Sequence, residues 1–296
     1  MQPDHITARL ADPTYLDRHL LALAVLRGFQ VAPWYDSHFL RYFEAAKAYL
    51  QEIASEHLER FIAGFAPLQN AGKNQGVQRV DALFESDVHE TIQRFIDALP
   101  KDQLERHEEE QFGRQILHDH RFVTGLQKAM LPRISQLVGE PLEAGYSFLC
   151  LYGENGICEP HMDEPISMYT LDYCVDSDAH WPIHFSKQVG WPGAEEMRAW
   201  RRDDILGDPA LEFAPHMIAP KQAILFNGSA HWHYRDRMAE GSHSHLLFFH
   251  FHPKGAGRLV RPPLWHDHFD LPVLQPLCDL FDDHYPPLGP AYQDAS

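Results

Sequence analysis

The sequence lacks long apolar runs and any excess of positive charge. Its longest uninterrupted apolar run, LLALAVL at residues 20–26, is far too short to cross a bilayer, which takes about 20 residues. Lys and Arg number 25 against 42 Asp and Glu, so the formal net charge is −17 with histidine neutral. Such a chain offers no basic face to nucleic acid or to an anionic membrane surface. We therefore expect neither as a partner, and the oligomeric state stays open.

Cysteine is also scarce. The four cysteines contain no C-x-x-C pair, which argues against a disulfide framework. The first ten residues, MQPDHITARL, have no apolar core of the kind found in a signal peptide. We therefore expect a reduced, cytoplasmic protein.

The first part of the chain has helical periodicity. Apolar side chains recur every three or four positions in residues 37–65, 82–100, 103–120 and 123–139, and we expect a break at Pro132. These segments carry no motif that indicates chemistry. We expect residues 1–140 to form a helical N-terminal region that covers one face of a sheet.

After about residue 141 the period of the pattern changes from 3.6 to 2. Short runs rich in aromatic and β-branched residues, separated by turn residues, are typical of an all-β barrel or sandwich; they lie at residues 146–152, 167–175, 181–185, 223–226, 230–235 and 245–252. The sequence thus predicts an α+β protein with a β core over 141–255. We expect residues 188–221 to form a lid-like insertion and the Pro-, Asp- and His-rich extension 256–296 to wrap over the barrel.

One histidine–carboxylate pair has the right context for a metal site. Residues two apart on a strand point to the same face, so His161 and Asp163 in YGENGICEPHMDEP can reach one ion. Three other His-x-Asp/Glu pairs lie in helical segments or in the tail. A strand-borne histidine follows about 70 residues later, in GSAHWHYRDR. Two histidines and one carboxylate leave half of an octahedral ion open, as in non-heme Fe(II) oxygenases.

Taken together, these segments resemble the Fe(II)/2-oxoglutarate-dependent oxygenases, in the branch that includes the prolyl hydroxylases. The resemblance covers about residues 141–254 and lies in four ordered pieces: LYGENGICEPHMDEP, YTLDYCVDSDAHWPIHF, APKQAILFNGSAHWHYR and HLLFFHF. It implies a double-stranded β-helix, or jelly roll, with flanking helices. It also implies Fe(II) as the metal, with 2-oxoglutarate and O₂ as cosubstrates.

The choice of the second histidine also depends on the resemblance. On a strand His231, His233 and Arg235 would all face the same way, so alternation does not separate them. The family's Gly-Ser-x-x-x-His-x-Arg pattern implies His233 as the ligand beside His161 and Asp163. His231 is the alternative, and His250 is expected to point away from the site.

The expected cosubstrate anchor is missing from its usual place. Family members carry Arg or Lys on the closing strand, where this chain has EGSHSHLLF. Arg235, His243 and His245 remain as candidates for the far carboxylate of 2-oxoglutarate, and Tyr152 can add a hydroxyl donor.

The leading hypothesis is therefore a hydroxylase that acts on a small carboxylate-bearing molecule, such as an amino acid or a derivative. The arginines of the insertion, among them Arg202, suggest that substrate class. The alternatives are a cupin-like Zn or Mn hydrolase or isomerase and a non-catalytic ligand-binding barrel.

Overall fold

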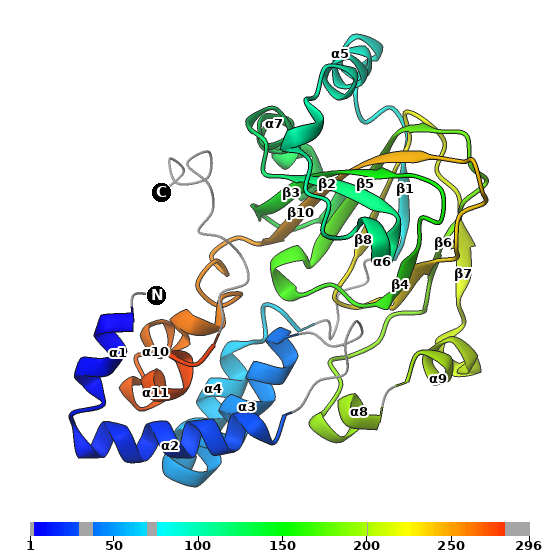
Figure 1. The fold of residues 1–296 in the computed structure, drawn as a ribbon. Coiled ribbons are helices and arrows are strands. Elements are labelled where there is room, and N and C mark those ends of the chain that lie inside the picture. The colour runs from blue at the N-terminus through cyan, green and yellow to red at the C-terminus, as the bar shows by residue number, and fades with distance from the viewer. Residues whose placement is uncertain (1–2, 30–37, 70–75, 200, 282–296) are drawn as a thin grey trace. The chain divides into compact units, whose positions relative to one another are not determined.

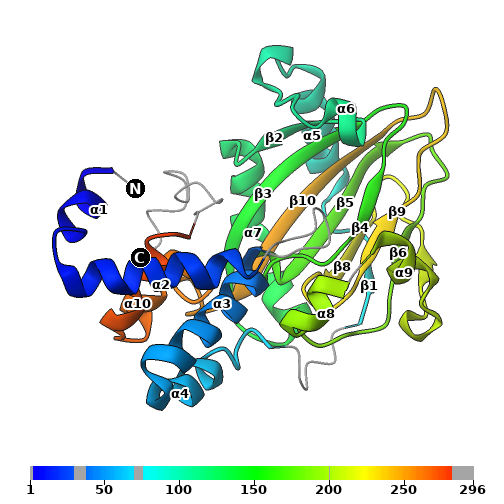
Figure 2. The same cartoon turned by 60° about the horizontal axis from the view of Figure 1, so that its bottom comes forward.

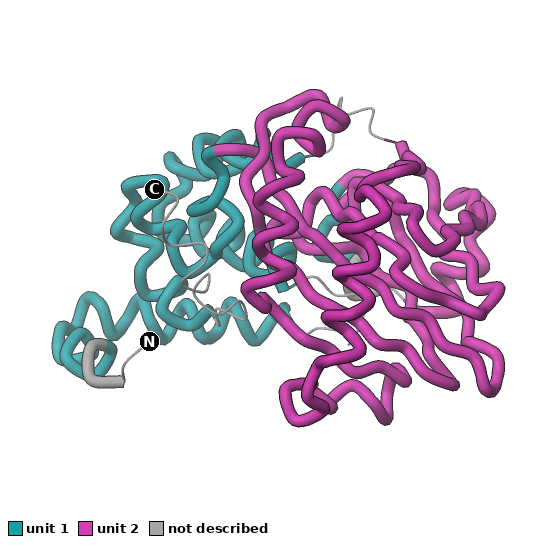
Figure 3. The backbone as a smooth tube through the Cα atoms, turned by 90° about the horizontal axis from the view of Figure 1, so that it is seen from above, with its two compact units in different colours: residues 1–69, 191–200, 255–286 teal, residues 70–190, 201–254, 287–296 magenta. Residues whose placement is uncertain are grey.

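The computed structural model describes residues 3–29, 38–69, 76–199 and 201–281, and it divides the chain into two compact units (Figures 1 and 3). One unit comprises residues 1–69, 191–200 and 255–286. The other comprises residues 70–190, 201–254 and 287–296. The helix–sheet boundary that the sequence suggests near residue 140 falls inside this second unit.

The first unit is helical. Its elements are α1 Pro3–Arg9, α2 Pro13–Arg27, α3 His38–Ile53, α4 Leu58–Gly64, α8 Ala194–Ala199, α10 Trp265–His268 and α11 Gln275–Cys278. Aromatic rings form its core: Phe39, Phe43 and Phe65 surround Trp191 of the insertion 188–221. Within the extension 256–296, which was expected to wrap over the barrel, α11 packs on α2 of this unit.

Among the described residues, the second unit contains every strand and four of the α-helices. Its helices are α5 Ser86–Asp97, α6 Glu109–Phe112, α7 Arg121–Val138 and the short α9 Arg202–Gly207 of the insertion. Its strands are β1 Gln78–Val80, β2 Arg114–His118, β3 Leu142–Tyr152, β4 Cys158–His161, β5 Tyr169–Ser177, β6 Ile183–Phe185, β7 Ala214–His216, β8 Ala223–Asn227, β9 His233–Arg235 and β10 Ser244–Pro253.

The strand order confirms the expected jelly roll. The larger sheet runs β1-β8-β5-β10-β3-β2 and the smaller β4-β9-β6-β7, and every pair is antiparallel (Figure 2). Without the two edge strands β1 and β2, the sheets have the orders β8-β5-β10-β3 and β4-β9-β6-β7, which are those of a double Greek key. The mixed fold and its barrel core are thus as the period change and the resemblance predicted.

Alternation along the strands gives the larger sheet two apolar faces. Leu149 and Leu247 pack in a cluster with Ile92 of α5 and Ile134 of α7, so helices cover the outer face. Leu246, the neighbour of Leu247, belongs instead to a second cluster between the two sheets. Positions of β10 with even numbers up to His250 therefore face the barrel interior.

Two of the helical expectations were wrong in detail. Residues 114–118 form the edge strand β2, paired with β3, rather than part of a helix over 103–120. The helix α7 runs through Pro132 without a break.

Candidate metal centre

Three predicted ligands come together where β4 meets β9. His161 and His233 are direct cross-strand partners in that antiparallel pair, and Asp163 stands two residues past His161. His161 Nε2 lies 3.5 Å and His233 Nε2 3.6 Å from the same oxygen, Asp163 Oδ1. The ring centroids of the two histidines are 4.2 Å apart. The three side chains therefore converge on one point inside the barrel.

Backbone carbonyls set the orientation of both imidazole rings. His161 Nδ1 lies 2.8 Å from the carbonyl oxygen of Glu159, and His233 Nδ1 lies 3.0 Å from that of His231. A carbonyl can only accept, so each Nδ1 carries a proton, and in the neutral ring Nε2 is then the nitrogen with the lone pair. Hydrogen bonds of this kind fix the tautomer of histidines that bind metals. The pair is thus arranged to donate electrons from both Nε2 atoms.

Charge and burial set the protonation of the group. Burial would raise the pKa of Asp163, but the imidazoles of His233 and His161 hold it well below its ordinary value. Burial lowers the pKa of His233 to about 3. Burial also lowers the pKa of His161, yet the Cys158 thiol and Asp163 outweigh it and raise that pKa. A metal would therefore meet a carboxylate and a neutral imidazole, and it would displace one proton from His161.

Gly228 makes room for Asp163. The Asp163 amide donates to the Gly228 carbonyl at 2.9 Å, and the Gly228 amide donates to the Met168 carbonyl at 2.8 Å. A Cβ atom on Gly228 would stand 1.9 Å from Asp163 Oδ2. Any larger residue in place of Gly228 would therefore collide with the Asp163 carboxylate.

We expect Gly228→Ala to weaken metal binding by at least about tenfold, because the added methyl group must push the carboxylate away from both imidazoles. Gly153→Ala is the matched control, since a Cβ atom there has nothing within 4 Å. Titration with cobalt(II), an air-stable substitute for iron(II), measures the dissociation constants. Equal affinities for the two variants would contradict this account of the site.

His231 lies outside the group. It precedes β9 rather than belonging to it, so strand alternation does not carry from His233 back to His231. Its Nδ1 lies 2.8 Å from the carbonyl oxygen of Ser186, the residue that follows β6. The structure thus separates two histidines that the sequence pattern left on one face.

Arg235 faces the interior but already has partners. Its Nη2 lies 2.6 Å from Asp172 Oδ2 on β5, and its Nη1 donates to the Trp181 carbonyl at 2.7 Å. The guanidinium also stacks over the Trp181 ring, 4.8 Å from its centroid. Both side chains of the ion pair are almost fully buried, with exposures of 4% for Arg235 and 0% for Asp172. The positive charge is therefore matched inside the protein.

The other candidate anchors differ in position. Tyr152 faces the interior, where its hydroxyl accepts from Arg114 Nη1 at 2.8 Å and its ring packs on Trp181. His243 lies instead between two carboxylates, with Nε2 2.8 Å from Asp176 and Nδ1 3.1 Å from Asp178. His245 stands beside His243 with Asp176, in a second group of side chains close enough to share an ion. The structure thus places neither histidine with the His161 group.

His250 was expected to point away from the site, and this was wrong. Its Nδ1 lies 3.0 Å from Thr170 Oγ1, and that hydroxyl lies 2.7 Å from Asp163 Oδ2. Leu247 and Phe249 face the helices, which puts His250 on the interior side. Neither Thr170 nor His250 belongs to the motif, and only the pairing of β5 with β10 connects them to it.

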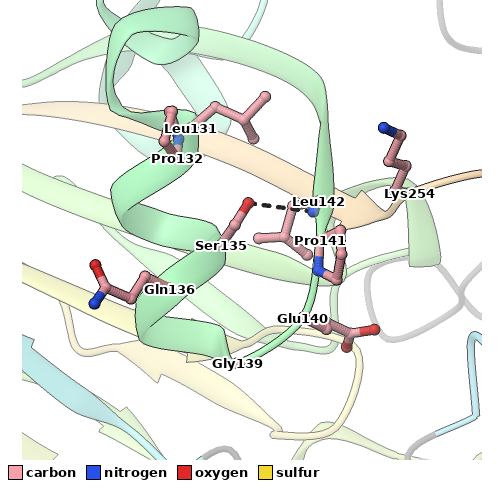
Figure 4. A pocket seen from close by; sticks show the side chains of 9 residues that line it. All are labelled: Leu131, Pro132, Ser135, Gln136, Gly139, Glu140, Pro141, Leu142 and Lys254. Atoms are coloured by element: carbon pink, nitrogen blue, oxygen red, sulfur yellow. Dashed lines mark hydrogen bonds between the residues drawn. The ribbon is translucent and has the colours of Figure 1, made fainter.

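Arg202 of the insertion lies near this group. It pairs with the side chain of Glu159 at 2.6 Å, and Glu159 stands two residues before His161 in β4. A surface hollow between α7 and the start of β3 is lined by residues such as Leu131, Ser135 and Lys254, and by none of the three ligands (Figure 4). No helix in the described part of the chain is long and apolar enough to cross a membrane.

Comparisons with known proteins give structural likenesses only. No family model and no curated protein matches the chain. HygX from Streptomyces hygroscopicus, solved with nickel and 2-oxoglutarate bound, is 11% identical over 66% of this chain and 87% of its own, with a TM-score of 0.46. A Pseudomonas putida prolyl-4-hydroxylase is 11% identical over 62% and 95%, with a TM-score of 0.42. The epimerase SnoN from nogalamycin biosynthesis is 15% identical over 70% and 90%, with a TM-score of 0.45.

Proposed function

We propose that this chain is a non-heme Fe(II)/2-oxoglutarate-dependent dioxygenase that hydroxylates a small molecule. The supporting observation is the convergence of His161 Nε2, His233 Nε2 and Asp163 Oδ1, with both Nδ1 atoms tied to the backbone. Two imidazoles and one carboxylate form a facial set that leaves the other positions of an octahedral ion open. The donor set fits iron(II), and these three residues would hold it.

The bound iron would activate O₂ as the oxidant, and 2-oxoglutarate would supply two of the electrons through its oxidative decarboxylation to succinate and CO₂. The chain itself keeps Asp163 ionised and fixes both imidazole rings through backbone carbonyls. Retention of a carboxylate at position 163 favours hydroxylation over halogenation, because halogenating members of the family have a small residue there.

Arg235 and Tyr152 are the residues we propose for the far end of 2-oxoglutarate. Arg235 stands two positions after His233 on the same strand, a rise of about 7 Å, which suits a five-carbon dicarboxylate that chelates through one end. Tyr152 shares the Trp181 wall with Arg235. The cosubstrate would be a second anionic partner of Arg235, beside Asp172. It would accept hydrogen bonds from the guanidinium N–H groups that do not donate to Asp172 or to the Trp181 carbonyl. His243 and His245 drop out of this assignment.

The substrate remains a small molecule in this proposal. The carboxylate-bearing class suggested by the sequence drew on arginines such as Arg202, whose charge is matched by Glu159. An amino acid or derivative would therefore need another cation for its carboxylate. A screen for succinate release stimulated by added amino acids, peptides and metabolites identifies the compound.

Anaerobic addition of iron(II) and 2-oxoglutarate tests the class directly. We expect the weak visible charge-transfer band that arises when the cosubstrate chelates iron through its keto and carboxylate oxygens. Omission of either component should remove the band. His243→Ala and His245→Ala serve as controls, and both should keep the band at the same 2-oxoglutarate concentration.

A cupin-like zinc or manganese enzyme predicts a different result. It would bind its metal through the same three residues yet show no band with iron(II) and 2-oxoglutarate, and no succinate on exposure to O₂. A non-catalytic barrel would bind its ligand without either signal. Either outcome would overturn the proposed function.

A further inference from the structure

The two oxygens of the Asp163 carboxylate have different neighbours. Oδ1 faces both imidazoles at 3.5 and 3.6 Å. Oδ2 is turned away and accepts a hydrogen bond from Thr170 Oγ1 at 2.7 Å. Gly228 closes the space on the same side, since a Cβ atom there would meet Oδ2. The carboxylate is therefore held so that one oxygen is offered to an ion.

The hydroxyl of Thr170 is itself held by a histidine. Thr170 and His250 are direct partners across β5 and β10, and Thr170 Oγ1 lies 3.0 Å from His250 Nδ1. A hydroxyl has one proton, and its two oxygen neighbours, the Asp163 carboxylate at 2.7 Å and the Ser167 carbonyl at 3.2 Å, can only accept it. His250 must then donate from Nδ1, so the proton order runs from His250 to Thr170 to Asp163.

In the part of the chain that the structure describes, this arrangement leaves one buried polar atom of His250 without a hydrogen bond. The tautomer leaves His250 Nε2 unprotonated, and within the described residues that buried atom has no hydrogen-bond partner. Leaving a buried acceptor without a partner is unfavourable, because the atom loses its hydrogen bonds to water and gains none in the protein. The other nitrogen of the ring, Nδ1, provides the donor that serves Thr170.

Packing prevents the His250 ring from turning. The Tyr146 ring lies 4.3 Å away between centroids, and the Phe148 ring lies 5.5 Å away at 25° between planes. Phe248 stands nearly parallel to it at 6.4 Å. The backbone is fixed as well, because the Gln127 side-chain amide donates to the His250 carbonyl at 2.8 Å. The ring is thus held by contacts on β3, β10 and α7.

We infer that Thr170 and His250 are positioning residues that hold Asp163 Oδ1 toward the metal and keep Oδ2 from it. This inference rests on the proposed metal centre. An ion bound through one carboxylate oxygen and two imidazoles keeps three of six positions open. A chelating dicarboxylate takes two of them and O₂ the third, so a second carboxylate oxygen on the metal would remove a position that the reaction needs.

Cobalt(II) affinity tests the hydroxyl at position 170. Thr170→Val keeps the shape of the side chain and removes the donor, and we expect about 10- to 100-fold weaker binding. Thr170→Ser keeps the hydroxyl and should restore affinity close to that of the unmodified protein. The cobalt visible spectrum gives a second readout, which should change in Thr170→Val and remain in Thr170→Ser.

The histidine has its own matched pair of variants. His250→Phe keeps a ring for stacking and loses the donor, whereas His250→Asn keeps an N–H group near the place of Nδ1. We expect the phenylalanine variant to bind cobalt more weakly than the asparagine variant. The double variant Thr170→Val/His250→Phe should bind no more weakly than the worse single variant, because both act through one hydrogen-bond chain.

The outcomes separate this inference from the proposed function and from a structural role. If the unmodified protein binds cobalt no better than His233→Ala, the metal centre itself fails. If it needs His233 but Thr170→Val and His250→Phe bind cobalt as well as it does, only the positioning role fails. A merely structural role would lower the unfolding midpoint of the metal-free protein and leave the affinity of the folded fraction unchanged, which would also overturn the inference.

Discussion

Alanine at His161, Asp163 or His233 is expected to abolish iron binding, whereas alanine at His231 is expected to leave it unchanged. Each of the first three supplies one of the three converging donor atoms, and two remaining protein ligands do not hold a labile divalent ion with useful affinity. His231 uses its Nδ1 on the Ser186 carbonyl and adds no donor to the group. Equilibrium titration with iron(II) under nitrogen measures all four variants.

The opposite result would assign the second histidine ligand to His231 instead of His233. If His231→Ala lost iron while His233→Ala kept it, the register of the segment after Gly228 would be wrong. Arg235 would then lose its assigned place as well, because that place follows from its spacing to His233. The unfolding midpoints of the metal-free variants serve as the control, since a variant that fails to fold also fails to bind.

Local patterns were enough to predict the barrel and the His161-x-Asp163 pair, whereas the choice of His233 over His231 rested on the resemblance. Side chains on a strand alternate with a period of two, so runs such as residues 223–226 and 245–252 were recognisable without any partner strand. The His161-x-Asp163 spacing is local in the same sense. Its meaning depended on a strand before it and another after it, and both were visible in the sequence.

The strand β2 was missed because its partner is distant. Residues 103–120 have helical spacing and many charged side chains, which favours a helix when the segment is considered alone. In the structure Gly113 adopts φ 62°, a left-handed conformation that ends α6, and the chain then pairs with β3. A Cβ atom on Gly113 would lie 2.7 Å from the Gly156 amide nitrogen. The turn therefore depends on a contact more than 40 residues away along the chain.

The partners of buried polar groups could not be predicted for the same reason. The pairing of Asp172 with Arg235 and of Thr170 with His250 requires the sheet order, which no local pattern contains. The sequence places Arg235 two positions after His233, the predicted metal ligand, and suggests an unpaired cation that could bind the 2-oxoglutarate carboxylate. In the structure Arg235 pairs with Asp172, a carboxylate on another strand. Removal of Arg235 should therefore lower the stability of the fold.

Arg235→Ala is expected to destabilise the fold by about 3–5 kcal/mol, because it leaves the fully buried Asp172 carboxylate without its cation. Asp172 Oδ1 already has no hydrogen-bond partner within the described residues, so no other donor stands ready to compensate. The paired replacement Arg235→Met/Asp172→Leu removes both charges and should recover most of the loss. Urea unfolding of the metal-free protein measures the three free energies.

The loss of unfolding free energy caused by Arg235→Ala should be smaller at acidic pH. Burial raises the pKa of Asp172 even beside Arg235, and removal of the cation raises it further. A carboxyl group whose pKa is higher in the folded than in the unfolded protein favours the folded state below its unfolded pKa, and this contribution is lost as the pH rises through the folded pKa. Unfolding of Arg235→Ala at acidic and neutral pH should therefore show the smaller deficit at acidic pH. A variant as stable as the unmodified protein at both pH values, with weaker 2-oxoglutarate binding, would contradict this and make Arg235 an anchor for the cosubstrate alone.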